Sequence, residues 1–167
     1  MVRWPGVTSP GSTCDDPVIS TDFYPTLLEI AGLPPKPSQH LDGASIVPLL
    51  RQSGAPDRDA IFWHYPHYGN QGGAPGGAVR SGDWKLIEWY EDGKIELFNT
   101  REDIGEKTNL VDREPERAKA LLEKLRSWRK QVEAAMPTPN PAHEPAGPDG
   151  RAPNQPPKKS AKKKKSD

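Results

Sequence analysis

The strongest hydrophobic pattern in the chain lies between residues 115 and 135. Six apolar side chains recur there at steps of three and four, so an α-helix would carry them on one stripe. They are Ala118, Leu121, Leu122, Leu125, Trp128 and Val132. Pro115 suits the first position of such a helix, and Met136-Pro137 favours its end. The pattern predicts a long amphipathic helix from Pro115 to about Ala135.

Short β-prone runs precede this helix along the chain. They are residues 60–63, 78–80, 84–90 and 95–99. The last two runs are joined by Glu91-Asp92-Gly93-Lys94, and Asp-Gly between such runs indicates a β-hairpin. Residues 64–77 lie between the first two runs and are expected to form an aromatic, then glycine-rich loop. Strands followed by a long amphipathic helix predict an α+β fold, in which the helix covers one face of a small antiparallel sheet.

The first third of the chain is rich in turn-forming residues. Residues 2–4 favour a short strand ahead of a turn-rich connector. A compact helix follows, with Asp22 as its expected N-cap and Gly32 at its end. Residues 33–59 are predicted to be mostly loop, interrupted by a short apolar turn at residues 46–50.

Composition separates the end of the chain from the rest. Residues 137–167 contain eight prolines, no aromatic residue and a closing run of lysines. They carry seven basic and three acidic side chains, a net charge of +4, although the whole chain is neutral. This composition is typical of a disordered tail. Residues 1–136 contain all five tryptophans, which is enough for one modest core, and carry the compensating negative charge.

Two classes of segment are missing from the sequence. No stretch approaches the roughly 20 apolar residues of a membrane span. Met1 is followed by Val-Arg-Trp-Pro-Gly, without the apolar segment of a signal peptide.

Cys14 is the single cysteine, which excludes an intrachain disulfide and a cysteine metal cluster. The neighbouring Asp15 and Asp16 would oppose thiolate formation, so we interpret Cys14 as a loop cysteine rather than a nucleophile.

The best candidates for chemistry lie in the run His64-Tyr65-Pro66-His67-Tyr68. Two histidines this close could converge on a metal or an anionic substrate. A zinc site needs further ligands, however, and the other histidines lie in a proline-rich loop and in the tail, which disfavours a metal site. The aromatic side chains could flank a sugar or aryl ring in a pocket. Equally, they could pack in the core while the histidines make local hydrogen bonds.

Three other features carry weaker signals. The glycine-rich run at residues 72–77 lacks the Lys-Ser/Thr ending of a phosphate-binding loop and is expected to be a flexible connection. Arg80 and Lys85 could meet an anionic substrate, although most basic residues on strands are simply solvated. The lysines of residues 158–165 could bind an anionic polymer or lipid. Without interleaved aromatic residues they do not indicate nucleic-acid recognition.

Four stretches in this order resemble the C-terminal part of the sulfatase family, in the alkaline-phosphatase-like superfamily. The similarity is to bacterial arylsulfatase and N-sulfoglucosamine-sulfohydrolase-like members. The first two stretches are Val2-Arg3-Trp4-Pro5-Gly6 with Pro10-Gly11, and Ser20 to Leu28 with Ala31-Gly32-Leu33, Leu41-Asp42-Gly43 and Pro48-Leu49-Leu50. The third and fourth are Phe62 to Tyr68 with Val79-Arg80 and Gly82 to Leu86, and Glu96 to Asn99 with Asp103, Glu106 and Asn109-Leu110.

The resemblance implies a fold and an activity. Residues 1–59 would end the catalytic α/β domain, residues 60–136 would form the sulfatase C-terminal subdomain, and residues 137–167 would be a disordered Pro/Lys-rich tail. The family hydrolyses sulfate esters with a formylglycine made from Cys or Ser in a Cys/Ser-x-Pro/Ala-x-Arg motif, and with a bound calcium ion. Concentrated positive charge is needed there because a sulfate ester and its leaving oxygen are anionic.

None of that catalytic set matches this chain. Cys14 is followed by Asp-Asp-Pro-Val, which lacks the required Pro or Ala and the Arg. By position, Met1 follows the family's last catalytic lysine, so we expect a fragment, a split gene or a mis-called start that is inactive alone. No catalytic residue, metal ligand or cofactor site is expected in it. Calcium and formylglycine are implied only for the full-length family.

The resemblance also implies what this part contributes. We expect substrate-pocket residues at His64, Tyr65, His67, Tyr68 and Arg80. The expected partners are the missing N-terminal sulfatase domain and a sulfated carbohydrate or aryl sulfate. Family members are commonly periplasmic or extracellular. The alternative is a non-catalytic accessory module whose basic tail binds anionic polymers.

Overall fold

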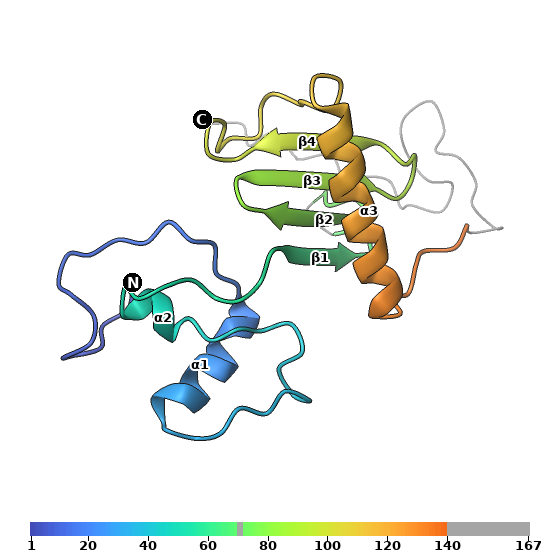
Figure 1. Cartoon of the computed structure of the whole chain (residues 1–167). Coiled ribbons are helices and arrows are strands. Elements are labelled where there is room, and N and C mark those ends of the chain that lie inside the picture. The colour runs from blue at the N-terminus through green and yellow to red at the C-terminus, as the bar shows by residue number, and fades with distance from the viewer. Residues whose placement is uncertain (70–71, 140–167) are drawn as a thin grey trace, which may run out of the picture. The chain divides into compact units, whose positions relative to one another are not determined.

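The computed structural model describes residues 1–69 and 72–139. Figure 1 shows its helices and strands along the chain. They are η1 (Ser20–Asp22), α1 (Phe23–Ile30), α2 (Val47–Leu50), β1 (Ile61–Tyr65), β2 (Gly76–Ser81), β3 (Trp84–Trp89), β4 (Ile95–Asn99) and α3 (Pro115–Gln131). Met1–Ala135 form one compact unit, and a second unit begins at Met136. The described part of the second unit contains no helix or strand.

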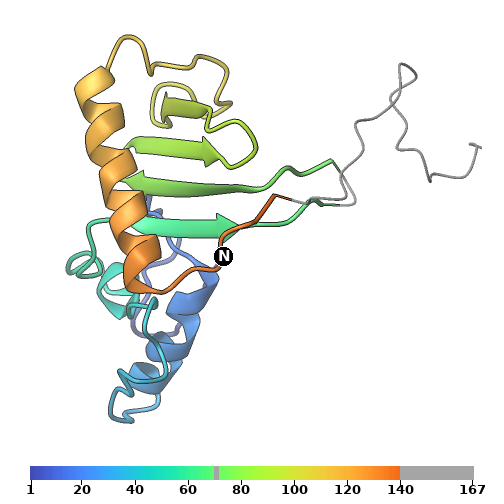
Figure 2. The same ribbon diagram turned by 90° about the vertical axis from the view of Figure 1, so that its right-hand side faces the viewer.

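The four strands form one antiparallel sheet in the order β1-β2-β3-β4. α3 lies across one face of this sheet, as Figures 1 and 2 show. The strand register places Phe62, Val79, Leu86 and Leu97 side by side in a row on that face. The last three are fully buried against Ala118, Leu121 and Leu125 of α3. This row and the buried side chains of α3 form the hydrophobic core of the sheet region.

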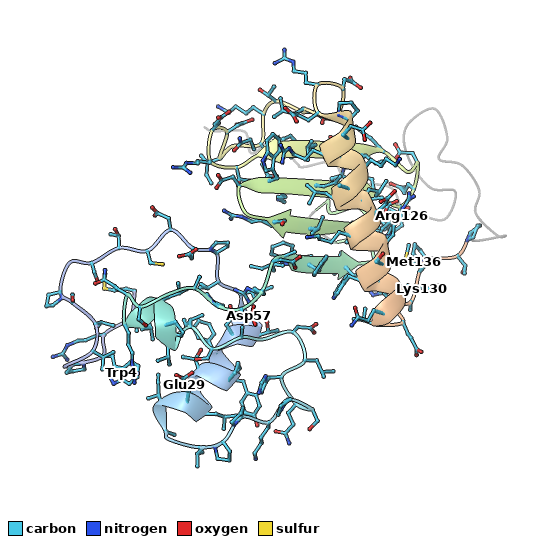
Figure 3. All side chains as sticks on the ribbon, in the orientation of Figure 1. Trp4, Glu29, Asp57, Arg126, Lys130 and Met136 are labelled. Atoms are coloured by element: carbon cyan, nitrogen blue, oxygen red, sulfur yellow. The ribbon has the colours of Figure 1, made fainter. Side chains whose placement is uncertain are left out.

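Aromatic and charged contacts fix α3 on the sheet at its C-terminal half. The rings of Phe62 and Trp128 stack at 4.8 Å with an interplanar angle of 7°. Glu88 is buried on the same face of the sheet and accepts hydrogen bonds at 2.6 Å from Arg126 and Arg129; Figure 3 labels Arg126 on the helix. A buried carboxylate needs such cationic partners to offset its lost hydration.

The predicted fold class is confirmed, namely a small antiparallel sheet with a long amphipathic helix on one face. The hairpin over residues 84–99 is also confirmed, with Gly93 at a φ of 70° in its turn. The helix begins at Pro115 as expected but ends at Gln131, so Val132 lies beyond it and is 45% exposed. The predicted tail, residues 137–167, lies almost wholly outside the described residues.

The prediction of a loop over residues 64–77 was wrong at both ends. β1 continues through Tyr65, and β2 begins at Gly76. The Trp89 and Tyr90 side chains leave little room for a Cβ at these two strand glycines. A Cβ at Gly76 would lie 3.3 Å from the Trp89 ring, and one at Gly77 would lie 2.3 Å from the Tyr90 hydroxyl. Sequence composition alone suggests a flexible loop here.

Residues 2–4 do not form the predicted strand. A strand requires a neighbour to receive its backbone hydrogen bonds, and no described strand pairs with them. Instead, the Thr8 backbone N–H donates to the Trp4 carbonyl, and the Trp4 N–H donates to the Thr8 hydroxyl. These bonds close a tight turn over residues 4–8. The proposed boundary between residues 59 and 60 stays a prediction.

The helix predicted after Asp22 is present as α1, and Gly32 follows its end with a φ of 69°. Asp22, however, does not cap α1 with its side chain. Its carboxylate is fully buried and accepts hydrogen bonds from the backbone N–H groups of Ile19 and Ala44 and from Arg58. Asp22 is therefore the N-cap residue of α1 by position, as predicted, but its side chain binds the segments before and after α1 instead of capping the helix.

Candidate functional site

The face of the sheet opposite α3 carries a hollow of about 490 Å³. The register explains its shape. On this face β2 contributes only Gly76 and Ala78 along most of its length, while Trp63 on β1 and Trp89 on β3 stand on either side. Because β1 and β3 lie about 10 Å apart, small residues on the central strand form a floor between two aromatic walls.

The aromatic walls differ in how they are held. The Trp89 indole N–H donates to the Glu96 carboxylate at 2.9 Å, and Lys94 pairs with the same carboxylate. These bonds lower the pKa of Glu96, with that from Lys94 contributing most, so Glu96 is ionised and fixes the Trp89 ring. Trp63 is 41% exposed and forms the more accessible wall. Both rings can contact a flat, partly apolar ligand.

One end of the hollow is charged. Arg80 and Lys85 are paired across β2 and β3 and both line it. The Lys85 ammonium group lies 2.7 and 2.9 Å from the two carboxylate oxygens of Glu106, which satisfies its charge. Arg80 only donates from Nε to the Gly82 carbonyl at 3.3 Å, and no described carboxylate forms an ion pair with it. Of the two basic side chains at this end, Arg80 is therefore the one without an ion pair among the described residues.

The structure brings two of the five predicted pocket residues into the hollow and separates them. Tyr65 and Arg80 both line it, but Tyr65 pairs with Gly76 and Arg80 pairs with Ile61. Four residues along a strand correspond to about 13 Å. The aromatic and cationic groups thus mark opposite ends of one elongated hollow. They do not converge on a single atom of a ligand.

His64 points to the other face of the sheet, toward α3. Its Nε2 lies 2.8 Å from the Ala135 carbonyl and its Nδ1 lies 2.7 Å from the Tyr90 hydroxyl. A carbonyl oxygen only accepts, so Nε2 donates to Ala135, while Nδ1 shares the second hydrogen bond with the Tyr90 hydroxyl. Both ring nitrogens are used in contacts that hold the chain after α3. His64 is therefore absent from the hollow.

His67 and Tyr68 follow β1 and lie outside the lining of the hollow. The His67 ring contacts the edge of the Tyr65 ring, with centroids 5.5 Å apart and an interplanar angle of 84°. Tyr68 is exposed and donates to Glu91 at 2.6 Å, a hydrogen bond that raises the pKa of Tyr68. These two side chains lie at the aromatic end of the sheet.

Sequence reasoning did not include Trp63 or Trp89 among the site residues. The signal that could have found them is the strict alternation of strand side chains. Trp63 shares a sheet face with Tyr65, and Trp89 shares that face with Lys85 and Ile87. The boundary of β1 was set too early, so this alternation was not followed to Tyr65.

The described residues do not fit the metal or nucleophile of a complete hydrolytic centre. Within residues 1–69 and 72–139, no three His, Cys, Asp or Glu side chains come together as metal ligands would. Cys14 is exposed, and its thiol donates to the Asp16 carboxylate, with sulfur and oxygen 3.5 Å apart. The hollow instead offers aromatic faces and a cationic end, which are the groups that a ring with an anionic substituent would contact.

The sequence contains no stretch with the length and apolar composition of a membrane-spanning helix. None of the helices in the described ranges is long and apolar enough to cross a membrane.

Comparison with known proteins gives these features a family. The model of the family described as "N-sulphoglucosamine sulphohydrolase, C-terminal" matches residues 1–133. The chain therefore belongs to this family of sulfatase C-terminal regions. This confirms the resemblance drawn from the four sequence stretches.

Curated relatives agree with this assignment. The chain is 38% identical over 143 residues to a sulfatase of Formosa agariphila, covering 77% of this chain and 26% of that protein. It is 30% identical to an N-acetylglucosamine-6-O-sulfatase of Bacteroides thetaiotaomicron, covering 78% of this chain and 24% of that protein. The chain thus spans about a quarter of the length of these relatives.

Solved structures share the fold. A protein in complex with its substrate D-glucosamine-2-N,6-O-disulfate superposes with a TM-score of 0.67 and 29% identity, covering 78% of this chain and 28% of that one. A 2-O glycosaminoglycan sulfatase superposes with a TM-score of 0.54 and 25% identity, covering 68% of this chain and 25% of that one. The sheet and helix described above are those of sulfatase C-terminal regions.

Proposed function

We propose that this chain is the C-terminal part of a sulfuric ester hydrolase and supplies substrate-binding groups and packing rather than the chemical step. The observation that carries this proposal is the hollow with aromatic walls that ends at Arg80. It lies in a chain that belongs to a family of sulfatase C-terminal regions. The catalytic nucleophile, formylglycine, and the calcium ion would belong to the rest of the enzyme. The chain alone would be inactive.

The substrate class is a sulfated carbohydrate, with aryl sulfates as the simpler analogue. Sugar rings have apolar faces that stack on aromatic side chains, which suits Trp63, Tyr65 and Trp89. Arg80 would form charge-assisted hydrogen bonds with an anionic substituent of the sugar. Two relatives whose names specify a sugar or a substrate, the N-acetylglucosamine-6-O-sulfatase and the protein solved with a disulfated glucosamine, support this class.

The remaining predicted residues take different positions around this pocket. We propose that His67 and Tyr68 form its rim at the aromatic end, next to Tyr65. His64 would act from behind the sheet by holding the chain after α3. Its proposed contribution to the pocket is therefore indirect.

The arrangement of the whole enzyme is part of the same proposal. Residues 1–59 would complete the catalytic α/β domain, residues 60–136 would form the C-terminal subdomain, and residues 137–167 would be a Pro/Lys-rich tail. The chain's small share of its relatives' length supports a missing N-terminal domain as its main partner. A periplasmic or extracellular location would give such an enzyme access to sulfated polysaccharides.

Direct ligand binding tests the pocket. D-glucosamine-2-N,6-O-disulfate, titrated into the 167-residue chain, should change its tryptophan fluorescence, whereas unsulfated glucosamine should bind far more weakly. Arg80→Gln should weaken binding of the disulfate roughly 10-fold or more, because a charge-assisted hydrogen bond is lost. Trp63→Ala should weaken both sugars.

Matched controls lie outside the hollow. Arg101 is 79% exposed in its ion pair and Tyr24 is an exposed aromatic residue, so Arg101→Gln and Tyr24→Ala should leave binding unchanged. Equal loss in these controls would contradict the pocket. Binding that instead disappears when the chain stops at Met136 would favour the alternative, an accessory module that holds anionic polymers through its lysine tail.

An activity assay tests the division of labour. The isolated chain should release no sulfate from 4-nitrophenyl sulfate, with or without added calcium. Turnover by the purified chain would show that its own residues catalyse hydrolysis, and would overturn the proposal that it acts only as a binding and packing part.

A further inference from the structure

α1 is apolar on two sides, and only one of them is covered. The apolar side chains of Pro25 and Leu28 are buried, together with Thr26. Phe23, Leu27 and Ile30 are 53, 62 and 41% exposed, and their spacing of four and three residues places them on one stripe. A helix that is apolar on opposite sides is typical of one buried between two layers. The described residues supply one of these layers.

Hydrogen bonds fix the direction in which this stripe faces. The Thr26 hydroxyl donates to the Asp22 carbonyl at 2.6 Å and accepts from the Ile46 N–H at 3.0 Å. The buried Asp22 carboxylate is held by Arg58, whose other bond goes to the Pro17 carbonyl. α1 cannot turn its exposed stripe inward without breaking these buried bonds.

A close backbone approach adds a second constraint at the start of the helix. A Cβ at Gly43 would lie 2.1 Å from the Thr21 carbonyl oxygen, so the connector is pressed against η1. Asp22, directly before α1, also accepts hydrogen bonds from backbone N–H groups on both sides of the helix in the chain, those of Ile19 and Ala44. The stripe is presented by a locally fixed element rather than by a loose segment.

We propose that the stripe Phe23, Leu27 and Ile30 is the surface on which the preceding part of the sulfatase packs. This inference rests on the proposed function, because that function supplies the occupant. The chain covers 26% of the Formosa agariphila relative, and its family is a C-terminal one, so about three quarters of such an enzyme remains to cover the stripe.

The size of the stripe favours this occupant over a second copy of the chain. α1 has eight residues and is about 12 Å long. A stable dimer normally buries about 800 Å² on each partner, far more than three side chains provide. The stripe contains no charged residue, and Glu29, labelled on α1 in Figure 3, lies outside it. Such a patch fits one portion of a larger apolar interface within a single enzyme.

The test compares the 167-residue chain alone with a fusion protein. In the fusion, the chain replaces the matching region of the Formosa agariphila sulfatase and is joined to the three quarters of that enzyme that precede it. Leu27→Glu should leave thermal unfolding of the isolated chain nearly unchanged, because Leu27 faces water there. In the fusion it should lower the melting temperature by roughly 5 °C or more, since a charge would be buried. Phe23→Glu should act in the same way.

Leu41→Glu is the matched control, because Leu41 is 83% exposed and lies outside the helix. It should change neither protein. If Leu27→Glu and Leu41→Glu have equal effects in the fusion, the docking surface is overturned. It is also overturned if the isolated chain is a dimer that Leu27→Glu separates, since a second copy would then cover the stripe.

Activity of the fusion separates this inference from the proposed function. A folded fusion that depends on Leu27 but hydrolyses no sulfate ester would contradict the proposed function and support the docking surface. An active fusion that is insensitive to both stripe variants would do the reverse. A fusion that does not fold with the native stripe would count against both.

Discussion

Residues 60–135 and residues 1–59 bury their apolar side chains to very different extents. In the first region the row Val79, Leu86 and Leu97 is completely covered by α3. In the second region a smaller set around α2 is buried, while most of the apolar side chains of α1 remain exposed. The first region closes a core of its own, and the second depends on a buried ion pair and on a surface that it does not provide.

This difference shows how a chain can divide its stability between apolar and polar contacts. A sheet and a helix that match in length can bury an uninterrupted apolar row, which contributes through its whole area. Short helices joined by loops bury little area, so single polar contacts decide their geometry. Four substitutions or changes of condition would test that contrast, from the largest expected effect to the smallest.

Leu125→Ala should give the largest effect. Leu125 is fully buried against the sheet, so its truncation should lower the free energy of unfolding by about 4 kcal/mol through lost burial and a cavity. The same change at Leu27, which is 62% exposed, should cost much less in the isolated chain. Urea unfolding of both variants measures the difference, and equal midpoints would contradict the contrast between the regions.

Asp22→Asn should destabilise residues 1–59 by about 3 kcal/mol, because it leaves the partly buried Arg58 guanidinium, 15% exposed, without its anionic partner. Asp59→Asn is the matched control, since Asp59 is 81% exposed in its pair with Lys124 and should change stability by less than about 1 kcal/mol. Hydrogen exchange should show faster opening around Asp22 in the first variant alone. Protection lost evenly across the sheet would contradict a local role.

Acid should open the same region. Burial alone would raise the pKa of Asp22, but hydrogen bonds from Arg58, Ile19 and Ala44 outweigh it, so the pKa lies below its ordinary value. Ionised Asp22 therefore stabilises the fold above about pH 4, and this contribution is lost as the pH falls through the folded-state pKa. Amide exchange between pH 5 and pH 2 should rise first around α1. Asp22→Asn should remove that step.

His64→Ala should have the smallest effect, about 1 kcal/mol, because it removes hydrogen bonds to Tyr90 and to the Ala135 carbonyl without opening the core. Residues 132–135 should lose amide protection, whereas β1 should keep it. His67→Ala is the matched control, since His67 is exposed and only contacts the edge of Tyr65. Loss of ligand binding in His64→Ala at unchanged protection would instead favour a direct pocket role.

The predicted elements succeeded where local signals agree. Pro115 and the apolar stripe marked α3, and Asp92-Gly93 marked the β3–β4 turn. The predicted strand at residues 2–4 was wrong because apolar composition does not reveal whether a partner strand is near. Gly76 and Gly77 were misread as loop residues. They lie on a strand where the Trp89 and Tyr90 side chains, from β3 and the turn after it, leave little room for a larger residue.

The candidate site was predicted less completely. Tyr65 and Arg80 were chosen from the sequence and do line the hollow, but the sequence gives no distance between them. His64 was grouped with them because it lies in the polar-aromatic run that follows the first predicted strand. Adjacent residues on a strand face opposite sides of a sheet, so placing β1 through Tyr65 would have separated them.

By itself, the sequence determined that this chain pairs a small antiparallel sheet with a long amphipathic helix and belongs with sulfatase C-terminal regions. Those conclusions depend on periodicity, turn residues and ordered motifs, all of which are local. Only the tertiary structure decided that Gly76 and Ala78 form a floor between Trp63 and Trp89, and that Asp22 is buried against Arg58. Strand register and contacts between distant residues create these features, and neither is written in any single stretch of the chain.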